Sequence, residues 1–353
     1  MKKILHIVGT RPNYVKAAPV IAALEGQPYS QLCVNTGQHS DKTMSSNMIK
    51  SLGMNPPNIN FYLKESNPFL RLGEIISNVA KTIEIESPDL VMVYGDVDST
   101  LAGAYAAARL QVPVAHVESG LRSFDRTMPE ENNRILIDQL ASIHFITEPS
   151  ASFNLLKEGH KESLHFVGNT MIDSLVKLQS SMNLGDSIER RVLLTFHRPS
   201  NVDNISFFKE LYEVCLNMSC PIVWPIHPRT KNSLKSFDLF ESFNSLKNMK
   251  IVPPMDYAEF LKIMSNSSVV ITDSGGIQEE TTFLNVPCLT IRKNTERPIT
   301  VTEGTNTLIS LGSVPKYINS VEKGAYKEST KILKWDGHAS QRIGEKLEAL
   351  SWG

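Results

Sequence analysis

The chain has few cysteines, and none of them forms a C-x-x-C pair. Its 353 residues hold four, at Cys33, Cys215, Cys220 and Cys288. Disulfide-rich domains and structural zinc sites need cysteines at short, regular spacings, so this distribution indicates neither. Scattered single cysteines are typical of reduced, buried thiols. We therefore expect a cytoplasmic protein.

Long hydrophobic runs and excess charge are also missing. The apolar run at the N-terminus, Ile4–Val8, is shorter than the ~7–15 apolar residues of a signal peptide, and no run approaches the ~20 residues of a membrane span. The net charge of −1 gives no electrostatic basis for binding nucleic acid or an anionic membrane. An anion site must therefore be a local arrangement of basic side chains and backbone amides.

Two nucleotide-binding motifs are absent as well. The turn Gly9–Pro12 follows the first expected strand, but it has one glycine where a dinucleotide fold needs G-x-G-x-x-G, and that motif occurs nowhere else. The sequence therefore predicts neither nicotinamide nor flavin, and no cofactor. The turn Asp273–Gly276 lacks the Gly-Lys-Ser/Thr of a P-loop. It is suited to a diphosphate that is held and released, not split.

The sequence does contain a regular alternation of short β-branched runs and longer helical patterns, which predicts parallel sheets with helices on both faces. The length exceeds one compact core, so we expect two doubly wound, Rossmann-like α/β domains facing across a cleft. We place them at 1–168 and 169–338, with the C-terminal helix 339–353 completing the first. The expected strands are 4–8, 31–36, 90–94, 114–117, 143–147, 164–167, 192–195, 222–225, 250–252, 269–272, 288–291 and 307–309. The expected helices of the first half are 12–24, 42–52, 68–86, 99–109, 130–140 and 149–157.

The most informative segment is Val269–Glu280, VVITDSGGIQEE. It predicts a buried strand, a tight turn and a helix. A helix N-terminus offers unpaired N–H groups and a partial positive charge to a phosphate. The small residues Ser274, Gly275 and Gly276 let an anion approach the backbone, and Glu280 lies where a carboxylate can bind a sugar diol.

Carboxylates follow two strands of the first half. Asp96 and Asp98 form a D-x-D pattern that could hold a divalent metal. We prefer Asp96 as a reacting carboxylate and Asp98 as the cap of the next helix, with no metal. Farther along, His116 and Glu118 lie two residues apart in a strand and face the same side. We keep Glu118 as a site residue and interpret His116 as structural.

Charged residues in other turns complete the candidate site. The loop Leu121–Arg134 is either a solvated surface or a source of acid and base groups. His197 follows a strand and suits proton transfer or a phosphate contact. Arg11 is expected to contact an anion, whereas Lys16 fits a surface charge equally well. Arg292 and Arg297 could bind diphosphate oxygens.

Several motifs together point to one family. GTRP with Lys16, VYGDVDST, HVESGLRS, MPEENNR, HRPSNVD, TDSGGIQEE and NTERP resemble the non-hydrolysing UDP-N-acetylglucosamine 2-epimerases. The similarity covers nearly the whole chain, and TDSGGIQEE combined with TERP is highly specific. The resemblance implies a two-domain GT-B fold, usually homodimeric, with no metal and no redox cofactor.

The resemblance also implies roles for individual residues. It carries UDP contacts onto Arg11, Met255, Phe260, Ser274, Gly275, Gly276, Glu280 and Arg297. It carries sugar and catalytic contacts onto Lys16, Asp96, Glu118, Glu130 and His197. The implied reaction is reversible C2 epimerisation of UDP-N-acetylglucosamine to UDP-N-acetylmannosamine, by elimination and re-addition of UDP through a glycal.

Alternatives remain at this point. A hydrolysing epimerase shares the fold, but Pro12 favours the non-hydrolysing branch. A GT-B glycosyltransferase using a UDP-sugar donor, or a catalytically silent UDP-sugar sensor, would bind UDP at the same turn. Two departures from the family's pattern bear on function. Gln38-His39 of the family's allosteric UDP-GlcNAc segment is present, but residues 40–42 differ from that segment's pattern, so activation by the substrate is not implied. Tyr14 stands where many members have a smaller residue, which could mean a different sugar, such as a diacetamido-uronic acid derivative.

Overall fold

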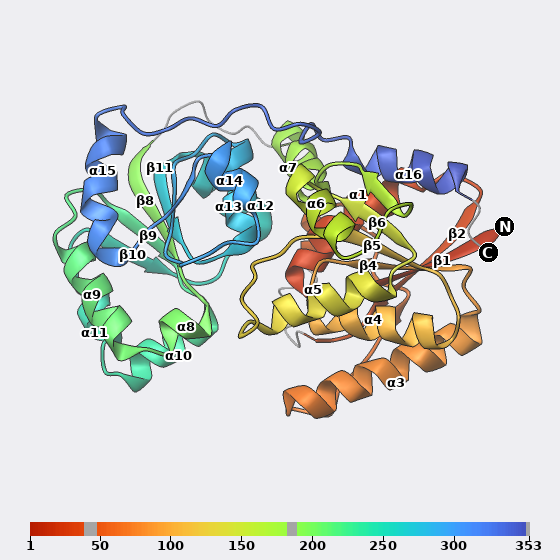
Figure 1. Cartoon of the computed structure of the whole chain (residues 1–353). Coiled ribbons are helices and arrows are strands. Elements are labelled where there is room, and N and C mark those ends of the chain that lie inside the picture. The colour runs from red at the N-terminus through yellow and green to blue at the C-terminus, as the bar shows by residue number, and fades with distance from the viewer. Residues whose placement is uncertain (39–47, 182–188, 351–353) are drawn as a thin grey trace. The chain divides into compact units, whose positions relative to one another are not determined.

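The computed structural model describes residues 1–38, 48–181 and 189–350 and divides the chain into two compact units (Figure 1). Unit 1 is Met1–Leu178 with Leu333–Gly353, and unit 2 is Gln179–Ile332. The division falls later than the expected residue 168, because the next helix packs into unit 1. On that helix Leu175 is 1% exposed, and the Ser174 hydroxyl donates to the Val15 carbonyl at 2.6 Å.

Unit 1 is built on a parallel sheet, which over the described residues has seven strands in the order β3-β2-β1-β4-β5-β6-β7. The central strands are buried runs rich in valine, as expected where helices cover both faces. The strands are β1 (Lys2–Val8), β2 (Tyr29–Asn35), β3 (Ile59–Asn60), β4 (Leu90–Tyr94), β5 (Val114–Ser119), β6 (Ile143–Ile146) and β7 (Leu164–Phe166).

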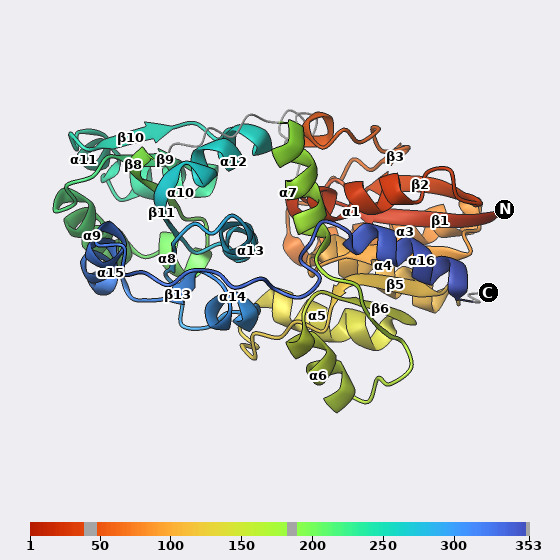
Figure 2. The same ribbon diagram turned by 90° about the horizontal axis from the view of Figure 1, so that it is seen from above.

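Helices cover both faces of this sheet. Figures 1 and 2 show α1 and α16 on one face and α3 and α4 on the other. The helices are α1 (Arg11–Ala23), α3 (Pro68–Glu86), α4 (Asp98–Arg109), α5 (Pro129–Leu140), α6 (Pro149–Lys157), α7 (Thr170–Ser181) and α16 (Ala339–Ala349). The expected helix 42–52 lies partly outside the described residues.

The C-terminal helix α16 packs against α1 in unit 1. Its first turn is fixed by Asp173 of α7, whose carboxylate accepts hydrogen bonds from the backbone N–H groups of Ala339 (3.1 Å) and Ser340 (2.6 Å). A carboxylate at this position satisfies the unpaired amides of the helix start and its partial positive charge. The return of the chain to unit 1 is therefore held by polar as well as apolar contacts.

Unit 2 repeats the architecture with a parallel sheet, which has six strands over the described residues, in the order β10-β9-β8-β11-β12-β13. The strands are β8 (Glu189–Thr195), β9 (Ile222–Pro225), β10 (Met249–Val252), β11 (Ser267–Thr272), β12 (Cys288–Thr290) and β13 (Asn306–Leu308). The helices are α8 (Pro199–Val202), α9 (Ile205–Leu216), α10 (Pro228–Ser236), α11 (Phe240–Asn244), α12 (Tyr257–Ser265), α13 (Gly275–Phe283), α14 (Pro298–Thr302) and α15 (Val314–Glu322), with a 3-10 turn η1 (Leu311–Ser313).

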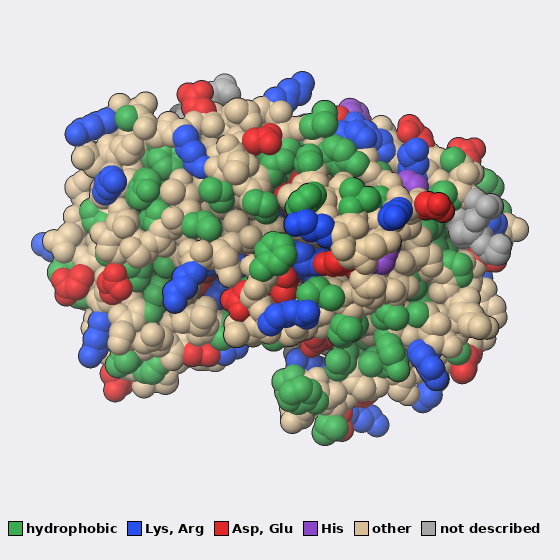
Figure 3. All heavy atoms as spheres, in the orientation of Figure 1, with side chains coloured by type: hydrophobic (Ala, Val, Ile, Leu, Met, Phe, Trp, Pro, Cys, Tyr) green, Lys and Arg blue, Asp and Glu red, His purple; other side chains and the backbone are tan. Residues whose placement is uncertain are grey.

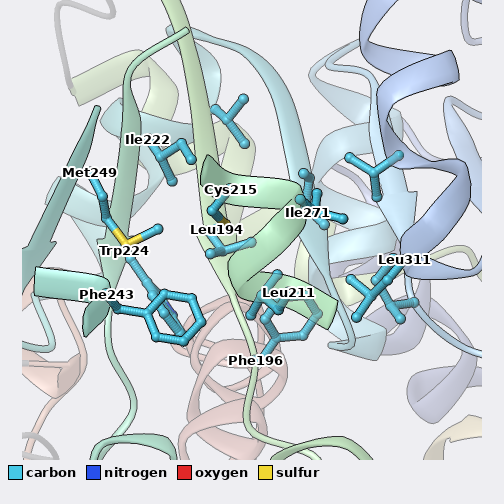
Figure 4. Close-up of a cluster of buried hydrophobic side chains, with 14 of the residues drawn as sticks. Leu194, Phe196, Leu211, Cys215, Ile222, Trp224, Phe243, Met249, Ile271 and Leu311 are labelled. Carbon is cyan, nitrogen blue, oxygen red and sulfur yellow. The ribbon is translucent and has the colours of Figure 1, made fainter. Parts of the chain in front are cut away.

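The core of unit 2 is rich in aromatic side chains. Trp224 of β9 and Phe243 of α11 are each fully buried, with ring centroids 5.4 Å apart and nearly perpendicular planes (Figure 4). Leu194, Leu211 and Ile271 pack in the same cluster. These contacts fix the sheet whose strand β11 leads into the turn Asp273–Gly276, the candidate phosphate turn.

In the described ranges, no helix is both long and apolar enough to cross a membrane.

Candidate active site

The candidate phosphate turn of unit 2 has the predicted local structure. Strand β11 ends at Thr272, Ser274 is the N-cap, and α13 begins at Gly275. A Cβ atom on Gly275 would lie 2.6 Å from Nη1 of Arg297 and 2.5 Å from Oε1 of Glu296. Only glycine therefore lets the Arg297 guanidinium lie against the helix N-terminus, where backbone amides and a cation can act together on an anion.

Arg297 is itself held by two buried carboxylates. Its Nε lies 2.8 Å from Oε2 of Glu279, and its Nη1 pairs with Glu296. Arg292 also pairs with Glu296, at 2.8 Å. The sequence presents both arginines as diphosphate ligands, whereas in the structure both charges are already paired with carboxylates. Because Arg297 is 5% exposed, its guanidinium has a fixed position in the described unit.

The expected ribose-binding carboxylate is also held in place. The Tyr257 hydroxyl donates to Oε1 of Glu280 at 2.6 Å, and Glu280 is 4% exposed. Tyr257 opens α12, which also carries the buried Phe260, and the half-buried Met255 precedes that helix. The family-implied positions Met255, Phe260 and Glu280 thus belong to one part of unit 2, joined by the Tyr257 hydrogen bond.

A buried amide links the phosphate turn to the rest of unit 2. Oε1 of Gln278 accepts hydrogen bonds from Thr295 Oγ1 (2.7 Å) and Asn306 Nδ2 (2.9 Å), and its Nε2 donates to the Ser274 carbonyl (3.2 Å). Sequence reasoning missed Gln278 and Asn306, because an amide in a helix and one in a strand give no local sign of partnership.

His197 is oriented by Asp273. The Asp273 carboxylate is fully buried and accepts hydrogen bonds from the backbone N–H groups of His197 (3.1 Å) and Arg198 (3.0 Å) and from Asn201 Nδ2 (3.1 Å). Its Oδ1 also lies 3.2 Å from His197 Nδ1. Burial raises the pKa of Asp273, but these hydrogen bonds and the His197 contact outweigh it and hold the pKa below its ordinary value. The sequence places Asp273 in the turn but gives no sign of this orienting role.

In unit 1, Lys16 of α1 forms a buried ion pair with Glu118. The two residues are 4% and 5% exposed, so the structure excludes a surface position for Lys16. The pair lies over Gly95, where a Cβ atom would be 2.7 Å from Lys16 Nζ and 3.1 Å from Glu118 Oε2. Glu118 has a φ of 72°, in the left-handed region that non-glycine residues rarely adopt. Residues in such conformations cluster at functional sites, although other residues of this chain, such as Ser87 and Gln111, also have a positive φ.

Asp96 is anchored by α5. Oδ2 of Asp96 lies 2.5 Å from Nη2 of Arg134, and Nη1 of Arg134 lies 2.7 Å from Glu131. The backbone carbonyl of Asp96 accepts a hydrogen bond from Asn133 Nδ2 at 3.0 Å. Glu131 and Arg134 are 1% and 2% exposed, so this end of the charged loop is not a solvated surface. Glu130 lies half-buried in the first turn of the same helix. The contacts of Asn133 and Arg134 with Asp96 could not be predicted from the sequence, which shows only that the two side chains are polar and charged.

The predicted cap of α4 is wrong. The helix begins at Asp98, and its N-cap is Val97, which makes no side-chain cap hydrogen bond among the described residues. Instead, Oε1 of Gln38 accepts from the backbone N–H (2.9 Å) and the hydroxyl (2.6 Å) of Ser99. A side chain from a distant segment thus replaces the local cap. His39 and residues 40–42 of the expected allosteric segment lie outside the described residues.

Two further expectations concern Arg11 and metal binding. Arg11 is the first, half-buried residue of α1, directly after the Thr10 cap. Within the described ranges, no group of three His, Cys, Asp or Glu side chains could hold a metal ion.

Comparison with known proteins identifies the family. The family model described as UDP-N-acetylglucosamine 2-epimerase matches residues 22–348. The chain belongs to the UDP-N-acetylglucosamine 2-epimerase family. A UDP-N-acetylglucosamine 2-epimerase of Methanocaldococcus jannaschii is 39% identical over 335 residues, which is 91% of each chain. The UDP-2,3-diacetamido-2,3-dideoxy-D-glucuronate 2-epimerase of Pseudomonas aeruginosa is 36% identical over 366 residues, covering 99% of this chain and 100% of the relative.

Comparison with solved structures supports the same family. The Methanocaldococcus jannaschii UDP-GlcNAc 2-epimerase in complex with UDP-GlcNAc and UDP has a TM-score of 0.90 and 37% identity, covering 99% of this chain and 100% of that one. A lipopolysaccharide outer core galactosyltransferase, 12% identical with a TM-score of 0.54, shares the fold alone. The expected epimerase family, isomerase class and GT-B-type fold, with two Rossmann-like domains, are confirmed.

Proposed function

We propose that this epimerase interconverts UDP-N-acetylglucosamine and UDP-N-acetylmannosamine without hydrolysing either. The observation that carries the proposal is the buried Lys16–Glu118 pair beside Gly95, with Asp96 next in the chain, at the carboxyl ends of β4 and β5. A protein that only bound UDP, or transferred a sugar to an acceptor, would have no use for a buried lysine and two carboxylates around one turn. The likeness to the Methanocaldococcus jannaschii complex supports the same substrate.

The chemistry that fits these groups is elimination followed by re-addition. A carboxylate removes the C2 proton while the C1–O bond to UDP breaks, which leaves a glycal and free UDP. UDP then re-forms the C1–O bond, and a proton is delivered to the opposite face of C2. Asp96, Glu118 and Glu130 are the proposed acid and base groups, and Lys16 supplies a positive charge beside Glu118.

This route requires UDP to stay bound while it is detached from the sugar. We assign its diphosphate to the backbone amides of Ser274, Gly275 and Gly276, with Arg297 fixed beside them. Arg11 is the proposed second basic contact. His197, oriented by Asp273, is proposed to stabilise the departing diphosphate.

The nucleoside is assigned to α12 and α13. Glu280 is proposed to bind the ribose hydroxyls, and Met255 and Phe260 to contact the remainder of UDP. Glu280 is well suited because Tyr257 already holds one carboxylate oxygen, which fixes the direction of the other. A carboxylate accepts two hydroxyl groups in a geometry that matches a diol.

A second substrate is favoured by one observation. The Pseudomonas aeruginosa relative acts on a UDP-2,3-diacetamido sugar acid, and the match spans all of that relative. The Tyr14 side chain, which the sequence analysis takes as a sign of a different sugar, is 1% exposed and packs inside unit 1. Tyr14 therefore offers little surface to a ligand. The support for a UDP-diacetamido sugar acid as substrate comes from the Pseudomonas aeruginosa relative and not from Tyr14.

Product analysis tests the proposal. The protein is incubated with UDP-N-acetylglucosamine, or separately with the UDP-diacetamido-glucuronate, and the products are followed by NMR. We expect a UDP-linked C2 epimer that approaches equilibrium from either side. Free N-acetylmannosamine with stoichiometric UDP would instead identify a hydrolysing enzyme. Conversion of the uronate alone would assign the second substrate.

We also propose a cytoplasmic homodimer. The first turn of α3 carries Phe69 and Leu70, which are 85% and 59% exposed, and Figure 3 shows apolar side chains gathered there. Apolar side chains exposed together are typical of protein–protein contacts. Each of the four cysteines is a buried free thiol, which suits a reducing compartment. Light scattering of the wild type and of Phe69→Ser tests the dimer, and a monomeric wild type would exclude it.

A further inference from the structure

One buried histidine has no part in the proposed chemistry. His116 of β5 is fully buried, and both ring nitrogens are hydrogen-bonded. Nδ1 lies 2.7 Å from Oδ1 of Asp138, and Nε2 lies 2.8 Å from the carbonyl oxygen of Gly95. The interpretation of His116 as a satisfied structural residue is confirmed in this respect. Its two partners raise the question of which protons the ring carries.

The partners require both nitrogens to be protonated. The Gly95 carbonyl can only accept, so Nε2 must donate to it. Oδ2 of Asp138 accepts from Arg122 Nη2 at 2.7 Å and from the Gly120 N–H at 3.1 Å, as an ionised carboxylate does. An ionised Asp138 can only accept, so Nδ1 of His116 must donate as well.

The same contacts hold the backbone around two proposed catalytic carboxylates. The Gly95 carbonyl, fixed by His116, immediately precedes Asp96 in the chain. Asp138 holds His116 through one oxygen and the Gly120 N–H through the other, so its carboxylate anchors the strand end on both sides of Glu118. That strand end contains the strained φ of 72° at Glu118, which must be fixed by its surroundings to persist.

We propose that His116 donates hydrogen bonds from both ring nitrogens and that, with Asp138, it is a positioning residue for Asp96 and Glu118. It does not exchange protons with the substrate, because both of its N–H groups are committed to fixed acceptors. The catalytic consequence rests on the proposed function, whereas the protonation state does not.

A second buried histidine in unit 1 provides a matched control. His144 of β6 is also fully buried and also contacts Asp138, but through the backbone carbonyl, at 2.9 Å from Nε2. Its Nδ1 lies 2.9 Å from the Ser163 hydroxyl, which can donate. Burial lowers the pKa of His144 to about 4, so this ring is neutral near pH 7. The two rings differ in whether they contact the carboxylate or the carbonyl of Asp138.

Several charged groups surround the His116 ring. Asp138 faces Nδ1 directly, and Arg122, which contacts its other oxygen, is neutralised by Glu158 through contacts of 2.9 and 2.6 Å. His144 adds no charge at neutral pH. Glu158, whose side chain is 28% exposed, thus pairs with Arg122 at the edge of the cluster, while the buried Asp138 faces both Arg122 and His116.

Histidine-selective ¹⁵N NMR of the whole protein tests the protonation state. The signals are assigned with His116→Gln and His144→Gln. We expect a proton on each ring nitrogen of His116, as its two acceptors require, and one bare nitrogen on His144. A bare nitrogen on His116 would overturn the proposal.

Kinetics tests the positioning role. Glutamine in His116→Gln can still donate one hydrogen bond but carries no charge. We expect its kcat to fall about 100-fold through misplaced carboxylates, while UDP affinity measured by calorimetry stays within about twofold. His144→Gln should keep the wild-type kcat. Wild-type turnover in His116→Gln would overturn the positioning role. If that variant does not fold, Asp138→Asn is measured instead, with Asp138→Glu as the rescue variant. Full turnover of Asp138→Asn would contradict the positioning role.

Failure of the proposed function is distinguishable from failure of this inference. A wild-type protein that leaves every offered UDP-sugar unchanged contradicts the proposed function. The NMR result on His116 is decided in the same sample without any substrate.

Discussion

Nδ1 of His197 lies 3.2 Å from Oδ1 of Asp273, and the same carboxylate accepts hydrogen bonds from the backbone N–H groups of His197 and Arg198. One buried acid thus fixes both the ring and the loop that carries it. The His197 side chain, held in this way, is still 38% exposed. A histidine oriented in this way can donate to a developing phosphate charge.

Asp273→Asn should therefore impair turnover. The amide cannot accept from all of the same donors as an anion, so His197 loses its fixed tautomer and orientation. We expect kcat to fall about 100-fold. Asp203→Asn is the matched control, because Asp203 pairs with Arg229 on the surface of the same unit and such pairs contribute little. Equal activity of the two variants would show that His197 needs no orienting acid.

Gly95→Ala should disrupt the Lys16–Glu118 pair. The new Cβ would lie 2.7 Å from Lys16 Nζ, and the φ of +66° is unfavourable for alanine by about 1–2 kcal/mol. Gly26→Ala is the control, since Gly26 has a φ of +79° and no described atom within 4 Å of its Cβ position. Both variants should lose stability in urea titrations, but only Gly95→Ala should lose epimerase activity. Loss of activity in both would trace the effect to backbone strain alone.

Gly275→Ala should weaken UDP binding. The methyl group would displace Arg297 and Glu296 from the start of α13, and calorimetry should show affinity reduced by about tenfold or more. Gly73→Ala, in a helical position of α3 where no described side chain lies within 4 Å, should leave UDP affinity unchanged. It should also raise stability by up to about 1 kcal/mol, because alanine favours helix over glycine. Unaltered UDP affinity in Gly275→Ala would contradict the assigned phosphate site.

Acid should destabilise the fold before the carboxylates titrate. Burial lowers the pKa of His6 and of His144 from 6.5 to about 4. The unfolded chain binds these protons from pH 6.5 downward, while the folded protein binds them only near pH 4, so stability present above pH 6.5 is lost as the pH falls between these values. The loss is roughly 3 kcal/mol for each histidine. Urea titrations at several pH values measure it.

His144→Gln provides the control for this pH effect. The variant removes one of the two titrating groups, so its free energy of unfolding should depend less steeply on pH between about 4 and 6.5. A slope equal to that of the wild type would show that His144 is already protonated in the folded protein.

Asp96→Asn and Ser274→Leu separate chemistry from binding. Asp96→Asn should abolish exchange of the C2 proton while UDP affinity stays nearly unchanged, because the substitution removes a carboxylate of unit 1 and leaves the phosphate turn intact. Ser274→Leu should instead damage UDP binding, because its bulk covers the start of α13. Full activity of Asp96→Asn would remove Asp96 from the catalytic group.

The sequence predicted the strands well because buried parallel strands are short apolar runs. Leu90–Tyr94 and Ile222–Pro225 begin and end at the predicted residues. The two-residue strand β3 was missed, since so short a pairing leaves no periodicity. The turn at Gly275 was predicted correctly, because glycine and small polar residues after a strand let an anion approach the backbone at the start of a helix.

Contacts between segments that are far apart in the chain could not be predicted from the sequence. Gln38 caps α4 in place of Asp98, and Arg134 reaches Asp96 from a different helix. Neither pairing has a local pattern, because a hydrogen bond between segments depends on the whole fold. The pairing of Arg297 with Glu279 and Glu296 is similar: the charges were visible, but not which group neutralises which.

The most direct test of the account is solvent exchange at C2. The protein is incubated with UDP-N-acetylglucosamine in D₂O with no acceptor, and both the recovered substrate and the epimer are analysed by NMR. Elimination and re-addition predict deuterium at C2 of both UDP-sugars. Recovery of both with protium at C2, or the absence of any epimer, would contradict the account.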